Sequence, residues 1–381
     1  MPASLIALCF GNFIIGTGTL IVPGMLPMLA EGLAVTLPVA GQLISAFAFT
    51  VCVSAPLLAG ATSRFDRRKL LVWMQLLYFA GHVAAALLSA FAPMLIARVL
   101  TSFGAALFTA QAAATAALLV PPERRGRAIA FVFLGWSIAS VIGVSLGAYV
   151  AATIGWRWGF ALVALGALVA AAGVWRYVPP GLRVQPVDGR MWKSILRNRR
   201  LLTVLSVTFL QSAPQFVILA YIVPATMLFL GASPEVLTLV LAGFGAVGVL
   251  GNVLAARYMD RFGPQKVVMA AMLSMLAAHL LWPWSNGMLA LYLVVLFLWG
   301  LGCFAANGAQ QARLAALAPQ QAPVLVALNS SALYLGQAAG PVIGGLVLAQ
   351  VSGVAAYQML AAVSVPLFVA AIAVSAFTAR R

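Results

Sequence analysis

Charged side chains are scarce in this chain of 381 residues, where Asp, Glu, Lys and Arg together make up 7% and hydrophobic residues 64%. A soluble domain carries roughly 25% charged residues. The shortage excludes a soluble fold, because too few polar groups remain to cover a water-facing surface, and it predicts a lipid bilayer as the surrounding partner. The net charge of +16 does not indicate nucleic acid as a partner, since the charges sit in short clusters between long apolar runs.

Groups that carry enzyme chemistry are also few. The six acidic residues lie in predicted loops or at predicted helix ends, and they are Glu31, Asp66, Glu123, Asp188, Glu235 and Asp260. The two histidines, His82 and His279, are isolated, and the three cysteines show no metal or disulfide spacing. A membrane enzyme needs a cluster of such groups. We therefore expect no enzyme, no catalytic residue, no metal and no cofactor.

Long apolar runs take the place of these groups. Twelve of them approach the ~20 residues that a membrane-spanning helix needs. Strand-like alternation is absent, and open backbone cannot face lipid, so helices are predicted. The predicted helices cover 4–29, 38–60, 69–90, 93–119, 127–152, 157–178, 201–230, 235–257, 265–285, 288–317, 323–350 and 354–378. The first run lacks a basic leader and is too long for a signal peptide, so we expect it to be retained.

The chain repeats itself at an offset of 197 residues. Arg64-Phe65 returns as Arg261-Phe262, and the same shift pairs prolines, glycines and the two histidines without a gap. Two similar membrane halves are the layout of many secondary transporters, whose substrate site lies where the halves meet. We predict an all-α integral membrane protein of 12 transmembrane helices in two pseudo-symmetric six-helix bundles. The bundles cover 1–178 and 201–381, and a basic cytoplasmic linker covers 179–200.

The positive charges predict the orientation of the chain. Of the 22 Lys and Arg residues, 20 fall in alternate loops or at the C-terminus, whereas Arg98 is interpreted as the only charge within a helix. The positive-inside rule places both termini in the cytoplasm. Seven of the basic residues lie in or next to the linker, where they are either solvated or in contact with anionic lipid.

Several motifs carry a resemblance to a known family. Asp260-Arg261-Phe262-Gly263 matches the core of a loop motif in the major facilitator superfamily, and Arg64-Phe65-Asp66-Arg67 is its less regular first copy. Leu95-x-x-Arg98 is similar to the family's fourth-helix motif. The glycines Gly143 and Gly147 resemble its antiporter motif, which is more complete at Gly340-Pro341-x-x-Gly344.

Finer features resemble the bacterial drug and sugar (arabinose-type) efflux branch of that superfamily. They include Ala40-Gly41-Gln42-Leu43, Gly155-Trp156-Arg157 and the stretch from Leu328 to Gln337. The resemblance implies a monomeric alternating-access exporter of small molecules in the bacterial inner membrane, with the proton gradient as its energy source. No carboxylate lies at mid-membrane, where many proton-coupled exporters of the family keep one, so an uncoupled facilitator and a transporter-like membrane sensor stay open as alternatives.

Candidate substrate residues are polar where the other half of the repeat is apolar. Gln215, for example, corresponds to Gly18. The resemblance places these positions on helices that line the family's cavity, although polar side chains also join helices as packing contacts. The candidates for the substrate cavity are Asn12, Gln42, Arg98, Trp136, Gln211, Gln215, Asn307, Gln310, Ser330, Tyr334 and Gln337. Arg98 has a second interpretation, in which it reaches out of the bilayer to the interface.

Two further sets of residues are candidates for movement between states. The loop motif could hold the halves together in one state through paired charges; its residues are Arg64, Asp66, Arg67, Asp260, Arg261 and Gly263. The glycines Gly143, Gly147, Gly340 and Gly344 are predicted to allow close approach between the two halves. His82 and His279 are paired by the repeat, which favours a scaffold role over a proton switch.

Overall fold

A computed structural model describes residues 2–62, 64–183 and 189–379, and this part of the chain is helical without any strand. Twelve of its helices are long and apolar enough to cross a membrane, as predicted. In chain order the elements are α1 (Ala3–Gly32), α2 (Leu37–Ala61), α3 (Arg67–Leu87), α4 (Phe91–Leu118), η1 (Pro122–Arg124), α5 (Arg125–Thr153), α6 (Trp156–Tyr177), α7 (Gly189–Arg197), α8 (Arg199–Leu219), α9 (Ile222–Leu230), α10 (Pro234–Phe262), α11 (Pro264–Leu281), η2 (Trp282–Ser285), α12 (Leu289–Leu317), η3 (Pro319–Gln321), α13 (Ala322–Gln350) and α14 (Gly353–Ala379).

The helix bounds confirm the 197-residue repeat. Shifting η1 and α5 by this offset gives the bounds of η3 and α13 without any difference, and the first residues of α2, α3 and α6 map onto those of α10, α11 and α14. The helices begin at equivalent positions although the residues there differ, as Leu37 differs from Pro234 and Arg67 from Pro264. The repeat is therefore structural as well as sequential.

The predicted helix 201–230 is wrong in one respect, because the structure divides it into α8 and α9. Tyr221 between them has φ −114° and ψ 18°, outside the helical region. The corresponding part of α1 carries a kink at Met25, which has φ −110° and ψ 15° and lies between Pro23 and Pro27. Proline removes an amide donor and crowds the preceding turn, which accounts for the kink in α1.

The chain forms two compact units. The first comprises Met1–Val35 and Ala46–Pro186, and the second comprises Thr36–Ser45 and Val187–Arg381. The helix α7 occupies part of the predicted linker, and its Ile195 joins a buried apolar cluster of the second unit with Leu314 of α12 and Val324 of α13. The predicted domain boundaries stay a prediction.

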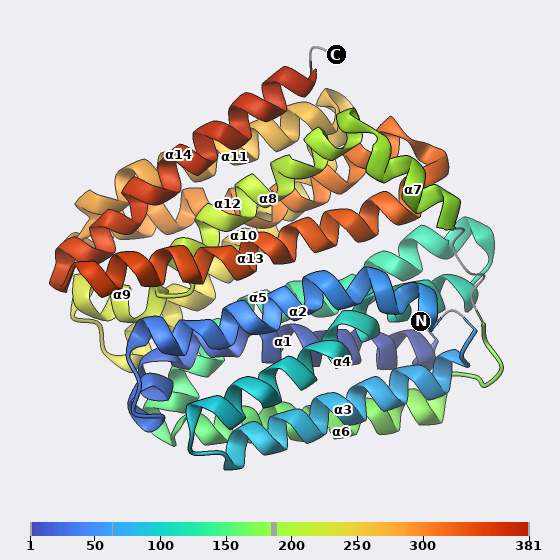
Figure 1. The fold of residues 1–381 in the computed structure, drawn as a ribbon, viewed down its shortest axis with the longest axis horizontal. Helices are drawn as coiled ribbons and strands as arrows, with labels where there is room; N and C mark the ends of the chain where they lie inside the picture. The colour runs from blue at the N-terminus through green and yellow to red at the C-terminus, as the bar shows by residue number, and fades with distance from the viewer. Residues whose placement is uncertain (1, 63, 184–188, 380–381) are drawn as a thin grey trace. The chain divides into compact units, whose positions relative to one another are not determined.

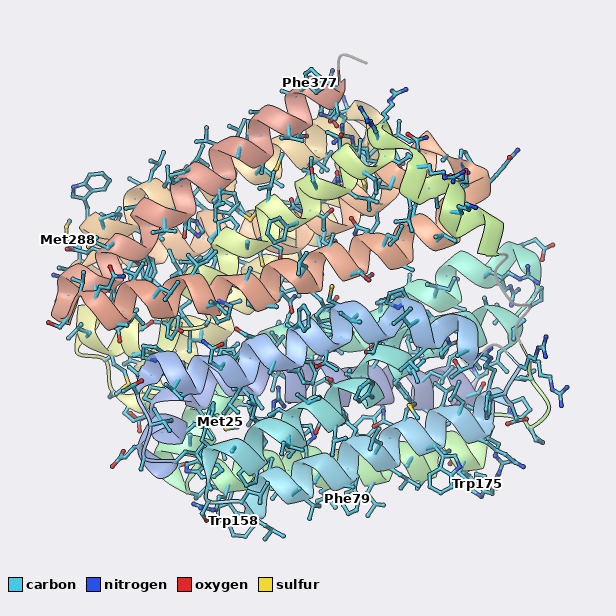
Figure 2. The ribbon with its side chains drawn as sticks, in the orientation of Figure 1. Met25, Phe79, Trp158, Trp175, Met288 and Phe377 are labelled. Atoms are coloured by element: carbon cyan, nitrogen blue, oxygen red, sulfur yellow. The ribbon has the colours of Figure 1, made fainter. Side chains whose placement is uncertain are left out.

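Large apolar side chains cover the outside of both units. Trp158 and Trp175 of α6 are both more than half exposed and point away from the helices (Figure 2). The guanidinium carbon of Arg68 lies 4.1 Å from the centre of the Trp175 ring. Lipid is the solvent that such a surface requires, and aromatic residues paired with cations are typical of the membrane–water interface.

Small residues hold the helices of each unit together. In the first unit α1 packs on α5, and in the second α8 packs on α13 (Figure 1). A Cβ added to Gly147 would collide with the carbonyl oxygen of Ile21 in α1, and one added to Gly344 would lie 2.6 Å from the carbonyl oxygen of Val217 in α8. Both glycines thus let two backbones touch within one unit.

The other two glycines of the predicted set also make contacts within their own unit. The nearest neighbours of Gly143 are Leu20 and Thr17, and those of Gly340 are Phe216 and Ala213. All lie in the glycine's own unit. The four glycines therefore serve contacts inside each unit, and their predicted role between the halves stays a prediction.

Candidate functional site

Arg98 is the centre of a buried polar cluster in the first unit. It lies in α4 and is 1% exposed. Its Nη1 donates to the carbonyl oxygen of Gly18 in α1 at 3.3 Å, and its guanidinium carbon lies 4.4 Å from the centre of the Phe47 ring. The side chain points inward to α1, so it does not reach out to the interface. No carboxylate among the described residues is buried beside it. A buried cation without a counter-charge is costly, and such a residue by default suggests a functional site.

His82 lies in the same cluster, on α3. Its Nδ1 is 2.8 Å from the carbonyl oxygen of Tyr78, and the two rings stack with centres 4.3 Å apart. The hydroxyl of Tyr78 donates to the carbonyl oxygen of Ile15 in α1 at 2.9 Å. Helices α1, α3 and α4 therefore meet around one arginine, one histidine and one tyrosine.

The other candidates of the first half and of α2 are not part of this cluster. Asn12 is fully buried, and its Nδ2 donates to the carbonyl oxygen of Val132 at 3.1 Å, which joins α1 to α5. Trp136 is half-buried and covers Gly16 of α1. Gln42 is half-buried and donates within its own helix to the carbonyl oxygen of Pro38 at 3.4 Å. These contacts are those of packing residues.

The second unit holds a network of neutral amides. Asn329 of α13 accepts from the hydroxyl of Thr208 in α8 at 2.5 Å, and its Nδ2 donates to Oδ1 of Asn307 in α12 at 3.1 Å. The network joins α8, α12 and α13. The sequence singled out Asn307 but missed Asn329 and Thr208; the signal that could have found Asn329 is its apolar counterpart Val132 in the first half.

The remaining glutamine candidates lie beside this network. Gln310 is fully buried, and its Nε2 donates to the carbonyl oxygen of Val204 at 2.7 Å. Gln215 donates to the carbonyl oxygen of Gln211 at 2.8 Å. The Oε1 atoms of Gln211 and Gln310 are buried and accept no hydrogen bond. Such acceptors cost about 1–3 kcal/mol each and are available to a donor.

The candidates on α13 are half-buried. Ser330 donates to the carbonyl oxygen of Val326 at 3.1 Å. Tyr334 and Gln337 follow it one and two helical turns later, on the same face of α13. The carbonyl oxygen of Pro341, further along α13, accepts from the hydroxyl of Tyr221 at 2.7 Å.

The first copy of the loop motif acts as a helix cap. Asp66 precedes α3 and accepts from the backbone amide of Lys69 at 3.0 Å and from that of Gly181, which follows α6. Burial raises the pKa of the Asp66 carboxyl, but these amide hydrogen bonds and the charge of Lys69 lower it further, so the net pKa lies below its ordinary value. Asp66 thereby ties the exit of α6 to the start of α3. Arg64 is exposed nearby.

The second copy is arranged differently. Asp260 and Arg261 are exposed in the last turn of α10, and the Arg261 guanidinium lies over the Phe262 ring at 5.1 Å. Gly263 both ends α10 and begins α11 with φ +77°, a conformation that glycine adopts without strain. The motif is therefore a turn between two helices, and its role in movement between states stays a prediction.

Comparison with known proteins identifies the family. A model of the Major Facilitator Superfamily matches residues 8–226 and 204–381. The chain belongs to the major facilitator superfamily. A chloramphenicol resistance protein of Streptomyces lividans is 31% identical over 361 residues, which cover 93% of this chain and 91% of that protein. The inner membrane transport protein YdhP of Escherichia coli (strain K12) is 30% identical over 347 residues, 90% of this chain and 88% of that protein.

A solved structure shares the fold. The crystal structure of a mutant of the nucleoside transporter NupG has a TM-score of 0.81 with 10% identity, and the match covers 98% of each chain. The family and its relatives bear out the resemblance to the bacterial drug and sugar branch. This major facilitator is thus a multi-pass membrane transporter that works by alternating access, and it is not an enzyme.

The structure buries two arginines that were assigned to loops from the sequence, Arg67 in the loop motif and Arg313 among the loop charges. Arg313 was counted among loop charges, but it lies in α12, 5% exposed, and donates to the hydroxyls of Ser375 at 3.2 Å and Thr378 at 2.6 Å in α14. Arg67 is fully buried in α3 and donates to Oε1 of Gln111 at 2.5 Å. Arg98 is therefore not the only charge within a helix. Helix α3 begins two residues before the predicted run 69–90, and Arg313 lies inside the predicted run 288–317. A neighbouring amide accepts from Arg67 and two hydroxyls accept from Arg313.

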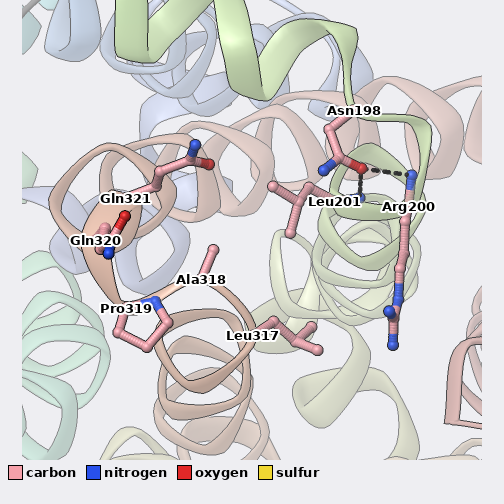
Figure 3. Close-up of a pocket in the computed structure, with 8 residues that line it drawn as sticks. All are labelled: Asn198, Arg200, Leu201, Leu317, Ala318, Pro319, Gln320 and Gln321. Atoms are coloured by element: carbon pink, nitrogen blue, oxygen red, sulfur yellow. Dashed lines mark hydrogen bonds between the residues drawn. The ribbon is translucent and has the colours of Figure 1, made fainter.

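A cavity of about 380 Å³ lies apart from all these candidates. It is formed by the start of α8 and the connection between α12 and α13 (Figure 3). Its Asn198 already caps α8 by accepting from the amides of Arg200 at 3.1 Å and Leu201 at 3.2 Å. The described residues offer no group of three His, Cys, Asp or Glu side chains that could hold a metal ion. The amide network and the Arg98 cluster therefore remain the candidate sites.

Proposed function

We propose that this transporter exports neutral, amphipathic small molecules from the bacterial cytoplasm by antiport with protons. It resides in the inner membrane as a monomer with both termini in the cytoplasm. The polar network of the second unit carries the proposal, because its side chains are amides and hydroxyls.

Neutral groups favour neutral substrates. Asn307, Asn329 and Thr208 present carboxamides and a hydroxyl, and Gln211 adds a buried acceptor without a hydrogen bond. No described carboxylate is buried. A site of this kind can exchange hydrogen bonds with the hydroxyl and amide groups of a substrate, whereas an organic cation would leave its charge without a counter-charge.

The relatives support the same class of substrate. The protein of Streptomyces lividans is named for chloramphenicol resistance. Chloramphenicol is neutral and combines an aromatic ring with hydroxyl and amide groups, which match the amide network in chemistry. We therefore take chloramphenicol as the first probe for this transporter.

A resistance assay tests the proposal. A chloramphenicol-sensitive strain that produces the transporter should tolerate severalfold more drug and accumulate less labelled chloramphenicol than a strain with an empty vector. Gln211→Leu should lose this protection at equal membrane abundance, since it removes the free acceptor. Gln358→Leu is the matched control, because Gln358 donates to the carbonyl oxygen of Pro283 away from the network. Equal drug accumulation with and without the wild-type protein would exclude this substrate.

An uncoupled facilitator is the second candidate function. The observation that favours it is the lack of a buried carboxylate among the described residues. A facilitator would equilibrate chloramphenicol across a vesicle membrane without accumulating it, and its rate would not respond to a pH gradient.

A further inference from the structure

The buried histidine beside Arg98 offers a proton site that needs no carboxylate. We propose that Nε2 of His82 binds the coupling proton, an inference that rests on the proposed proton-driven transport. His82 is 1% exposed, and its Nδ1 lies 2.8 Å from the carbonyl oxygen of Tyr78. A carbonyl only accepts, so Nδ1 carries the hydrogen of the neutral ring and Nε2 carries a lone pair. No hydrogen bond reaches that atom.

On the side that faces α1, the space beside Nε2 is too small for another heavy atom. A Cβ built on Gly18 of α1 would lie 2.7 Å from Nε2 of His82, 2.5 Å from the Tyr78 hydroxyl and 2.8 Å from a methyl group of Val163. These distances are below any normal contact. Between His82 and Gly18 a substrate group therefore cannot enter, whereas a proton can. A buried Nε2 without a hydrogen bond can take up a proton. His279 also has such an Nε2, and the feature that sets His82 apart is the charge of Arg98.

Among the described residues, the charge that acts on the His82 ring comes from helix α4. Arg98 of α4 acts on the imidazole with its positive charge. Tyr78 stacks from the same helix as His82, α1 contributes the backbone of Gly18, and α6 contributes Phe160 with ring centres 5.9 Å apart. No described carboxylate is buried there to neutralise a second cation.

This arrangement makes proton binding depend on conformation. A proton on Nε2 would place a second positive charge beside Arg98, and repulsion is strong where water is excluded. Arg98 in turn holds α1 through the carbonyl oxygen of Gly18. Proton uptake is therefore favoured only after Arg98 or α1 has moved, and by linkage the proton favours that moved state. The proton enters from one side, rests on Nε2 and leaves when Arg98 returns.

Histidine NMR tests proton binding without any substrate. The chain has two histidines, so His279→Asn leaves His82 as the only one, and His82→Asn leaves His279. Asn keeps a donor near the position of Nδ1 but does not titrate. Tag-free protein labelled with ¹⁵N-histidine should show the His82 signals moving from the neutral to the charged form as the pH falls, while the protein stays folded. The His279 signals should stay neutral. A His82 ring that remains neutral until the protein unfolds overturns the proposal.

A transport assay separates this proposal from the proposed function. In proteoliposomes with chloramphenicol as the probe, His82→Asn should lose uptake driven by a pH gradient but keep exchange of labelled for unlabelled drug. His279→Asn should keep both. Gradient-driven uptake that persists in His82→Asn overturns the proton site and leaves the proposed antiport standing. Exchange without any gradient effect in the wild type overturns both the proton site and coupling but leaves transport standing.

Discussion

His82 and His279 stand at the same position of the repeat, yet their surroundings differ. Each places Nδ1 2.8 Å from the carbonyl oxygen four residues earlier. The charge of Arg98 acts on His82, and both side chains lie against Gly18 of α1. His279 is enclosed by the rings of Trp299 and Phe368, with ring centres 5.0 and 4.8 Å away. The repeat conserves the contact of the histidine with its own helix, whereas the neighbouring helices decide its chemistry.

The counterparts in the other half explain the difference. Arg98 corresponds to Val295, and Trp299 corresponds to Ser102. One half thus places a cation near its histidine and the other an aromatic ring. A duplicated fold can in this way keep one scaffold while one copy gives its histidine a charged neighbour and the other an aromatic one.

Removing the positive charge of Arg98 should have the largest effect on the difference between the two histidine sites. Arg98→Ala loses a hydrogen bond from a charged group, worth about 1.5–3 kcal/mol, and should slow chloramphenicol transport roughly 10- to 100-fold. Arg98→Lys keeps the charge and should retain more activity. Vesicle transport at matched protein levels measures both variants. Wild-type rates in Arg98→Ala would mean that the cluster is only structural.

The glycine contacts should be equivalent in the two halves. Gly147→Ala and Gly344→Ala each insert a methyl group against a backbone carbonyl, so each should destabilise the protein by about 1–3 kcal/mol. Gly243→Ala in α10 is the control, because nothing lies within 4 Å of its added Cβ. Thermal unfolding in detergent measures the effect. A Gly147→Ala protein as stable as Gly243→Ala would contradict the close packing of α1 on α5.

Substitutions in the two copies of the loop motif should differ in their cost to stability, by less than the glycine substitutions. Asp66→Ala removes a helix cap and should cost about 0.5–2 kcal/mol, whereas Asp260→Ala should stay within about 0.5 kcal/mol because Asp260 is exposed. The pKa of Asp66 is lowered in the folded protein, so its carboxylate stabilises the fold above the unfolded pKa of about 3.9. This stability is lost as the pH falls through the folded pKa.

Unfolding curves of both variants at neutral and acidic pH provide the check. The difference between Asp66→Ala and the wild type should shrink in acid. A difference that stays constant with pH, or an equal loss in Asp260→Ala, would show that the carboxylate of Asp66 does not act as the cap.

Much of the fold could be predicted from the sequence because lipid imposes simple rules. Apolar run length sets the number of spans, and the offset of 197 residues sets the helix bounds of one half from the other. The break at Tyr221 was missed because its cause is local backbone geometry within a continuous apolar run. Helix periodicity gives no signal for such a break.

The sites were predicted less completely, because partners on other helices cannot be identified from one helix. Asn307 was found by its mismatch in the repeat, but its bond to Asn329 depends on how α12 meets α13. Arg313 was missed because it lies near the end of an apolar run, and only the hydroxyls of α14 account for its burial. His82 was interpreted as scaffold because the repeat pairs it with His279, and the repeat carries no information on Arg98 as a neighbour.

The most direct test of the account is uptake of labelled chloramphenicol by inside-out membrane vesicles with and without a pH gradient. The vesicle lumen then corresponds to the outside of the cell, and an acidic lumen supplies the movement of protons out of the vesicle that antiport requires. The account predicts accumulation above the external concentration with the gradient and mere equilibration once an ionophore removes it. Equal uptake in both conditions would contradict proton-driven export.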